Sequence, residues 1–269
     1  MDTSKEVKSR NSRLKIFFKL AISLLVFLLA FLVFYIVMSA FSTSRWVKDV
    51  NSRYSEQVHE RYDPQLINNQ KYIALQNEIA FIKAQLSMAK TDSIGLIINI
   101  PDSTMTLDIS GVDVSVAKII NSKFSRSLYA IDHRALAIML SEPLRITNSV
   151  ASIEKEPIIN KIAQKDTTEA SLPDKIQEII KDEPVYFELT LENELKILVI
   201  QQEELSKISR FKFSLNLAVQ RAIKDTKSIL KFRLPDYSPV IQLIVSEKDA
   251  RAIYRAIPEK GKTCLFLIN

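Results

Sequence analysis

Three side chains of this sequence are suited to covalent or proton-transfer chemistry, namely Cys264, His59 and His133. A cysteine thiolate attacks a carbonyl group when a neighbouring imidazole takes its proton, so Cys264 and His133 are the candidate pair. Cys264 lies between Thr263 and Leu265 in a strongly apolar run. A buried thiol there behaves as a small hydrophobic side chain with a raised pKa. His59 lies among polar residues and is predicted to be a solvated surface residue. We therefore predict that none of these residues is catalytic.

Other kinds of chemical site lack their residues in the sequence. Structural zinc needs three or four clustered Cys, His or carboxylate ligands, and the chain has one cysteine and two histidines. The acidic residues of the C-terminal half are scattered, without the facing carboxylate pair that glycosidases use. Neither a P-loop nor a GxGxxG motif occurs. We expect no metal and no cofactor, and binding in preference to catalysis, with an enzyme of unrecognised site as an alternative.

The element that positions the rest of the chain is the apolar stretch from Leu20 to Phe41, LAISLLVFLLAFLVFYIVMSAF. Its 22 residues carry no charge, and a helix of that length covers the roughly 30 Å hydrocarbon thickness of a lipid bilayer. Within a bilayer the backbone amides must be satisfied inside the segment, which predicts a helix. Tyr35 and Trp46 bracket the outer interface, where amphipathic aromatic rings concentrate. We predict an uncleaved membrane anchor over 20–41, with a cleaved signal peptide as the alternative.

The charge beside the apolar stretch predicts its orientation. Residues 1–19 contain six Lys or Arg and two Asp or Glu, which gives about +4. The positive-inside rule places such a tail in the cytoplasm. The C-terminal domain would then be periplasmic, and the protein a single-pass inner-membrane protein of a Gram-negative-type cell. Without the tail, the formal net charge falls from +6 to about +2, so nothing indicates binding to nucleic acid.

Residues 42–90 are predicted to form a helical stalk. Apolar residues recur there with alternating spacings of three and four, which is the heptad pattern of a coiled-coil seam. The seam residues are Tyr72, Leu75, Ile79, Ile82, Leu86 and Ala89. One interpretation is a short parallel coiled coil that makes the protein a homodimer. The alternative is that the stripe packs on the chain's own globular domain.

The pattern changes from a helical to a strand period at residue 91, so 91–269 is predicted to be one β-rich domain. The fold class is a membrane helix and helical stalk followed by an α+β domain, mainly antiparallel, barrel- or sandwich-like, with a few short helices. The predicted strands are 96–100, 105–109 and 112–116, each half buried, then the hairpin 185–191 and 195–199, and finally 239–245 and 263–268. The predicted helices are 130–140 and 250–257, the second of them capped by Ser246.

Two stretches of the domain have no clear assignment. Residues 142–183 contain three prolines among many charges and are predicted to be an irregular insertion, with weak strand signals near 144–146 and 158–162. Residues 203–231 are ambiguous, because FKFSLNL alternates as a strand does whereas LAVQRAIKDTKSIL has the pattern of an amphipathic helix.

The two ends of the domain resemble a known family. The run GLIINIPDSTMTLDISGVDVSVAKI is similar to the first hairpins of the YkuD-type L,D-transpeptidases, which cross-link peptidoglycan, and VSEKDARAIYRAIPEKGKTCLFLI is similar to their last helix and strand. In that family a Ser-x-Gly-Cys-x-Arg loop lies just before the closing helix. Here the corresponding stretch is YSPVIQLIVSEKDA, with Gln242 at the expected place of the nucleophile. The resemblance thus implies a relative without catalytic activity.

These observations lead to three hypotheses of function. The first is a membrane-anchored, non-catalytic envelope protein whose degenerate transpeptidase-like domain is a scaffold that binds peptidoglycan or a partner protein. The second is a structural component of a trans-envelope complex, such as a secretion or division machine. The third is an enzyme that acts on peptidoglycan through an unrecognised site.

Overall fold

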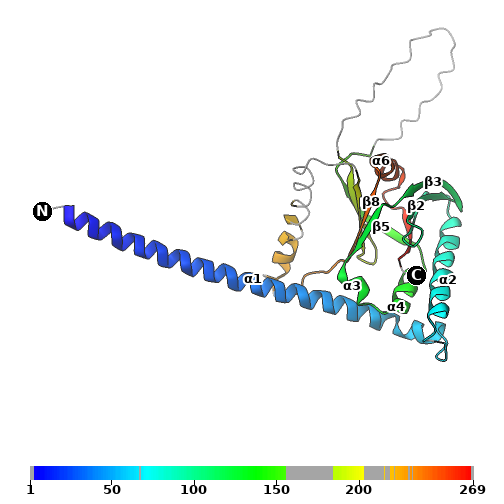
Figure 1. Ribbon diagram of the computed structural model, residues 1–269, viewed down its shortest axis with the longest axis horizontal. Coiled ribbons are helices and arrows are strands. Elements are labelled where there is room, and N and C mark those ends of the chain that lie inside the picture. Colours follow the sequence, from blue (N-terminus) through cyan, green and yellow to red (C-terminus); the bar gives the residue numbers. More distant parts are fainter. Residues whose placement is uncertain are drawn as a thin grey trace, which may run out of the picture. The chain divides into compact units, whose positions relative to one another are not determined.

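The computed structural model describes residues 3–66, 68–155, 184–202, 215, 219–220, 222–229, 231 and 233–267 (Figure 1). The chain divides into two compact units, one made of residues 1–46 and 214–237 and the other of residues 47–213 and 238–269. The helices are α1 (Thr3–Arg61), α2 (Gln70–Ala89), α3 (Arg126–Tyr129), α4 (His133–Met139) and α6 (Glu247–Ala256). The strands are β1 (Gly95–Asn99), β2 (Thr104–Ile109), β3 (Val112–Lys118), β4 (Asn121–Phe124), β5 (Leu144–Ala151), β6 (Tyr186–Leu191), β7 (Lys196–Gln201), β8 (Val240–Val245) and β9 (Lys262–Phe266).

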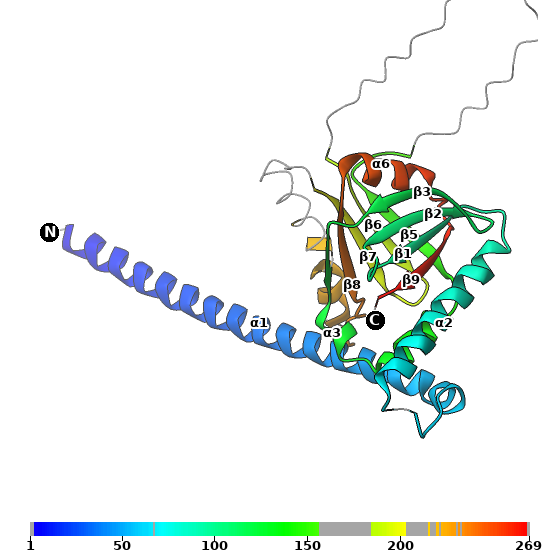
Figure 2. The same cartoon turned by 45° about the vertical axis from the view of Figure 1, so that its right-hand side comes forward.

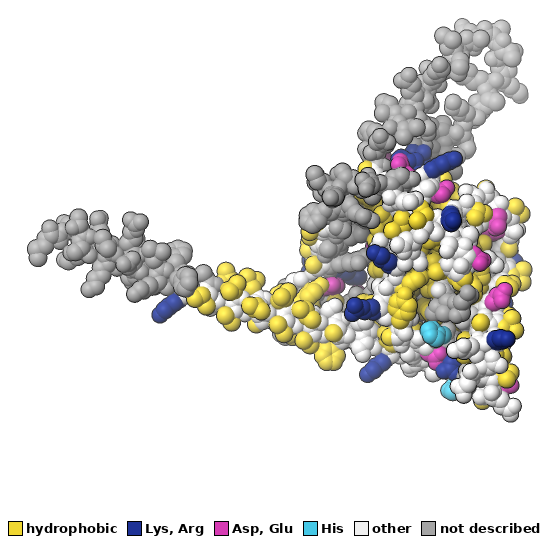
Figure 3. Space-filling model, viewed as in Figure 1, with side chains coloured by type: hydrophobic (Ala, Val, Ile, Leu, Met, Phe, Trp, Pro, Cys, Tyr) yellow, Lys and Arg dark blue, Asp and Glu magenta, His cyan; other side chains and the backbone are white. Residues whose placement is uncertain are grey.

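Helix α1 contains the whole apolar stretch and continues beyond it to Arg61. The helix predicted for residues 20–41 is therefore confirmed. Its apolar side chains, among them Leu20, Phe27 and Phe41, are exposed within the chain, and they make an apolar rod in the surface view (Figure 3). Among the described residues, this is the one helix long and apolar enough to cross a membrane, and its place near the N-terminus suits a single anchor or a signal sequence.

The second unit contains a nine-stranded sheet with the order β3-β2-β1-β9-β5-β6-β7-β8-β4. Only the pairs β1–β9 and β7–β8 are parallel, and the other six neighbouring pairs are antiparallel. The predicted α+β class with a mainly antiparallel sheet is thus confirmed. The barrel- or sandwich-like closure is not, because β3 and β4 end an open sheet.

Most local predictions agree with the structure of this unit. The alternating hairpin is formed by β6 and β7, and its turn holds Glu194 at a positive φ of 66°. The predicted short helices correspond to α4 and α6. The strand signal near 144–146 is real and extends to Ala151 as β5. The signal at 158–162 lies outside the described residues, and so does most of FKFSLNL. Residues 222–229, within the predicted amphipathic helix, are helical.

The core lies between the sheet and the helices that cover it. Helix α2 packs beside β9 (Figure 2), where Phe81, Ala84 and Met88 form a buried cluster with Ile97 and Cys264. Gly95 lets α2 approach this closely, because a side chain at that position would collide with Met88. Residues 42–90, predicted as a stalk, thus include a helix that is also a layer of the domain.

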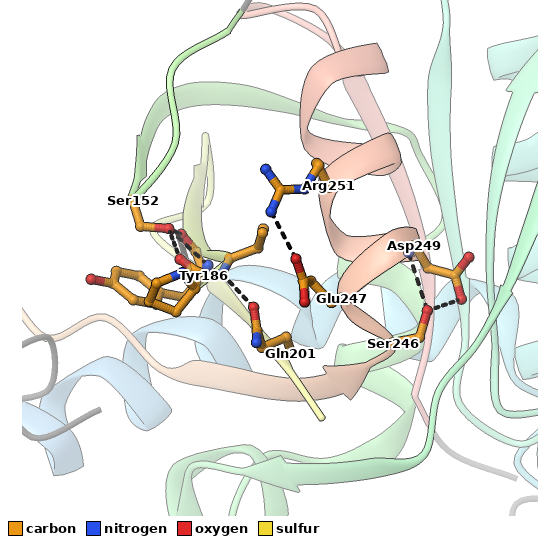
Figure 4. Close-up of polar contacts among 9 residues, drawn as sticks. Ser152, Tyr186, Gln201, Ser246, Glu247, Asp249 and Arg251 are labelled. Atoms are coloured by element: carbon orange, nitrogen blue, oxygen red, sulfur yellow. Dashed lines mark hydrogen bonds and ion pairs between the residues drawn. The ribbon is translucent and has the colours of Figure 1, made fainter. Parts of the chain in front are cut away.

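Farther along the sheet, α6 covers β6 and β7. The ring of Phe187 on β6 is fully buried and lies 5.2 Å from the ring of Tyr254 on α6. Two hydrogen bonds join described residues on either side of 156–183 to neighbouring strands of this layer. The Tyr186 N–H donates to Ser152 Oγ at 3.1 Å, and the Val185 N–H donates to the Gln201 side chain at 2.5 Å (Figure 4). That segment therefore connects the neighbouring strands β5 and β6.

Helix α6 begins with the predicted capping arrangement. Ser246 Oγ accepts the Asp249 N–H at 3.1 Å and donates to the Asp249 carboxylate at 2.8 Å (Figure 4). We expect Ser246→Ala to lower the free energy of unfolding of the purified chain by about 1 kcal/mol, because one helix N–H loses its acceptor. Ser246→Thr keeps that acceptor, and Lys248→Ala changes an exposed residue of the same helix. Denaturant unfolding should show a loss for the first variant alone, and an equal loss for Ser246→Thr would contradict the capping role.

Candidate functional site

The candidate nucleophile Cys264 lies in the interior of the sheet. It belongs to β9, which is hydrogen-bonded on both sides by β1 and β5, and its side chain is completely buried. The thiol contacts Met88 Sδ at 3.7 Å. Burial raises the pKa of the Cys264 thiol from 9.0 to about 12, with a smaller contribution from the charge of Asp108. A thiol with that pKa has almost no thiolate at neutral pH, so Cys264 is a core residue, as predicted.

The two histidines lie elsewhere and at the surface. His59 is exposed on α1, and His133 is exposed as the first residue of α4. Next to it, Asp132 caps α4 and accepts hydrogen bonds from the side chain of Arg134 at 2.9 and 2.5 Å. The hydrogen bond from the Arg134 side chain lowers the pKa of Asp132, although partial burial acts in the opposite direction. The buried cluster that contains Cys264 includes no histidine, so the candidate pair is not brought together.

A shallow, open pocket lies where α2, α4 and β9 meet, and its roughly 290 Å³ of empty space includes open solvent. Its walls are mainly apolar, and its polar members are Asn77 and His133. Asn77 is buried, and its side-chain oxygen has no hydrogen-bond partner among the described residues. The arrangement can hold a small apolar group. Its lining includes no thiol and no hydroxyl group, and among the described residues no group of three or more His, Cys, Asp or Glu side chains could hold a metal ion.

The residues predicted at the ends of the membrane anchor lie in the first unit. Leu20 and Phe41 are exposed. Tyr35 donates a hydrogen bond to Asp225 at 3.0 Å, and the ring of Trp46 lies edge-on to that of Tyr237 at 5.9 Å. Both interface aromatics therefore contact the segment 214–237, which sequence reasoning did not connect with the apolar helix.

A third contact of this kind joins the hydroxyl of Ser42 to the backbone oxygen of Pro235. The available sequence signal was the amphipathic pattern of residues 217–230, which marks a helix but does not identify what it packs against.

The predicted stalk seam lies on the face of α2 that points away from its own domain. Leu75, Ile82 and Leu86 are 54, 52 and 62% exposed, while Ile79 and Tyr72 are half-buried. The residues that α2 buries belong to a different set, the packing face: Asn77, Ala80, Phe81, Ala84 and Met88. At the N-terminal end of the seam, the Tyr72 ring lies edge-on to the buried ring of Tyr62 at 6.2 Å, and its hydroxyl accepts the Asp63 N–H at 3.0 Å. The alternative that the stripe packs on the chain's own domain thus applies to Tyr72 and not to Leu75, Ile82 and Leu86.

A second exposed apolar surface lies on the edge strand β3. Val112, Val114 and Val116 are exposed, although this strand was predicted to be half buried like the two before it. The reason is topological, because among the described strands β3 is the last of the sheet and pairs with β2 alone. Exposed apolar edge strands are surfaces for adding a further strand.

Comparisons of the sequence and the structure with protein-family models, curated proteins and solved structures give no match.

Proposed function

We propose that this chain is a single-pass membrane protein of the cell envelope whose C-terminal α+β domain acts as a scaffold for other envelope proteins and catalyses no reaction. The observation that carries the proposal is the apolar part of α1, which is long enough to cross a bilayer and which the described part of the chain leaves unburied. In water, exposing so much apolar surface would be costly, whereas lipid is its natural environment.

The basic tail supports an orientation with the N-terminus in the cytoplasm and the domain in the periplasm. The contacts of Tyr35 and Trp46 support a position of the C-terminal end of the anchor at the membrane surface. Tyr35 and Trp46 each pair with a side chain that carries a polar group, Asp225 and Tyr237. Such polar partners suit the headgroup region at the end of the span better than the hydrocarbon core.

Binding in preference to catalysis is supported by where the reactive and apolar groups lie. The one thiol is buried in the core, whereas apolar side chains are exposed on α2 and β3. Exposed apolar surface is typical of protein-binding sites. Peptidoglycan is polar, and the support for its binding is the resemblance of the domain's two ends to L,D-transpeptidases. Gln242 of β8, at the expected place of the nucleophile, has an amide side chain that cannot attack a carbonyl. We therefore favour a protein partner, as in a secretion or division complex, over peptidoglycan.

The orientation in the membrane can be tested by cysteine labelling, because Cys264 is buried and should not react with the label. Val112→Cys places a thiol on the exposed strand β3, and Ser4→Cys places one in the basic tail. In intact spheroplasts, a membrane-impermeant maleimide should label the first variant and label the second only after the membrane is opened. Labelling of Ser4→Cys in intact spheroplasts would contradict the orientation. A soluble product below the full 30.7 kDa would indicate a cleaved signal sequence.

Partner class can be tested with the same full chain in mild detergent. We expect it to co-purify with an envelope protein and to remain in the supernatant when purified sacculi are pelleted. Variant Val114→Asp, which places a charge on the exposed β3 surface, should reduce the co-purification. Pelleting of the chain with sacculi, without an associated protein, would replace the protein scaffold by a peptidoglycan-binding role.

A further inference from the structure

We propose that two copies of this chain associate through a parallel two-stranded coiled coil formed by helix α2. The interface consists of five of the seam residues given above, Tyr72, Leu75, Ile79, Ile82 and Leu86. The helical pairing itself follows from α2 alone, and its parallel direction also agrees with two copies anchored in one membrane, which rests on the proposed function.

The first argument is that α2 is apolar on two opposite faces. One face packs on the sheet through Phe81, Ala84 and Met88. The opposite face carries the seam, whose Leu75, Ile82 and Leu86 are each more than half exposed. A helix that is apolar all round is normally covered on all sides. Because the domain covers one side of α2, the seam requires a separate partner.

The second argument is that the spacing of the seam fits a helix of the same sequence. With Tyr72, Ile79 and Leu86 at heptad position a, Leu75 and Ile82 fall at position d. Side chains at these positions interlock when two helices supercoil around each other. Packing against a flat or irregular partner would need apolar residues on one face of α2. It would not need their spacing to alternate regularly between three and four residues.

The third argument comes from the charges that flank the seam. Glu78 is at heptad position g and Lys83 at the following position e, and both are exposed. In a parallel pair, position g of one helix lies beside the next position e of the other. Glu78 therefore faces Lys83 of the second copy, and the twofold symmetry makes this ion pair twice.

An antiparallel pair would arrange these charges differently, because e positions then face e positions. The e positions of α2 are Gln76 and Lys83, followed by Lys90 just beyond the helix. Lys83 would then have no acidic residue opposite it. The charges thus favour the parallel arrangement, in which each Lys83 has a carboxylate partner.

The interface is short, so its stability depends on preorganisation. Isolated helices of this length are marginal in water, but α2 is already fixed by its packing face. Its N-terminus is capped by Asn69, whose side-chain oxygen accepts the N–H groups of Lys71 and Tyr72 at 3.0 and 3.4 Å. Association therefore does not have to order the helix, and anchoring two copies in one membrane raises their effective concentration.

Disulfide trapping tests the register of the proposed pair. In a parallel coiled coil, a cysteine at position a lies beside the same residue of the second copy, so Ile79→Cys should give a disulfide-linked dimer under mild oxidation. Ser87→Cys is the matched control, because Ser87 is exposed on α2 but lies off the seam. We expect at least tenfold more cross-linked dimer for Ile79→Cys, in the full-length chain purified in detergent. The unmodified chain should give none, because its Cys264 is buried. Equal trapping at both positions, or none at Ile79→Cys, would overturn the proposal.

A charge exchange tests the same pair without introducing a thiol. Glu78→Lys places two lysines opposite each other and should weaken dimerisation at least severalfold in a dilution series. Glu78→Lys/Lys83→Glu restores opposite charges and should recover it. Both residues are exposed, so circular dichroism should show an unchanged fold. Failure of the double variant to recover the dimer would exclude the parallel pairing. Both assays use detergent, so they can succeed even if the labelling experiment disproves the membrane orientation.

Discussion

Cys264 should react with iodoacetamide at pH 8 about a thousandfold more slowly in the folded chain than in denaturant. At pH 8, a thiol with its ordinary pKa of 9.0 is about one-tenth thiolate, whereas one with a pKa of about 12 is about 10⁻⁴ thiolate. The thiolate is the reacting species, so this ratio alone gives the expected difference. Complete burial against α2 and β1 can only increase it.

The measurement is the rate of alkylation followed by mass spectrometry, with the same chain in guanidinium as reference. The variant Val112→Cys adds an exposed thiol on β3 and serves as an internal standard, because it should react at nearly the denatured rate while Cys264 does not. Comparable rates at the two sites of the folded variant would mean that Cys264 is accessible and ionised. The catalytic candidate would then have to be reconsidered.

The raised pKa also predicts a pH dependence of stability. The folded state holds the thiol proton more tightly than the unfolded state does. The stabilisation is therefore fully present below pH 9 and is lost as the pH rises towards about 12. Lysines and tyrosines titrate in the same range. The quantity to compare is therefore the difference in the free energy of unfolding between the unmodified chain and Cys264→Ala. That difference should shrink by about 1.5 kcal/mol between pH 9 and about pH 10.5. No change would contradict the burial of a neutral thiol.

Phe187→Ala should lower the free energy of unfolding of the purified chain by about 3 to 5 kcal/mol, the cost of truncating a fully buried aromatic side chain. Phe187 has no exposed surface and lies against Tyr254, between the centre of the sheet and α6. Its removal leaves a cavity that two layers of regular structure cannot easily fill. Few single changes cost as much, and a domain of ordinary stability would lose a large fraction of its total.

The matched control is Tyr129→Ala, because it also truncates an aromatic side chain but at an exposed position. It should cost less than about 1 kcal/mol. Denaturant unfolding of the full-length chain, followed by near-ultraviolet circular dichroism, measures both. A loss of under about 1 kcal/mol for Phe187→Ala would show that β6 and α6 do not form the core described here.

How much of the fold the sequence could predict depends on how local each feature is. The hairpin of β6 and β7 was predictable, because both strands alternate and the turn between them is short. The cap of α6 and the buried state of Cys264 were also predictable from neighbouring residues. Each follows from residues that are adjacent in the chain.

Features decided by distant residues were not predictable. The heptad pattern of α2 identified which residues share a face, but not that the opposite face packs on the sheet. Nothing local distinguishes Val114 on β3 from Leu107 on β2, since both alternate with polar neighbours. One is exposed and the other buried because β3 is at the edge. The contact of Tyr35 with Asp225 joins residues 190 positions apart, which no periodicity can show.

The place of β9 has a consequence for how this domain is assembled. Strand β9 comes after all the other strands in sequence, yet it lies between β1 and β5. Before it enters, the sheet consists of two fragments, β3-β2-β1 and β5-β6-β7-β8-β4, each with an unpaired inner border. A nascent chain must therefore wait for residues 262–266 before these halves can join. Until then, each fragment exposes an unpaired strand edge that can associate with other chains. We therefore expect chaperones to be needed most towards the end of synthesis.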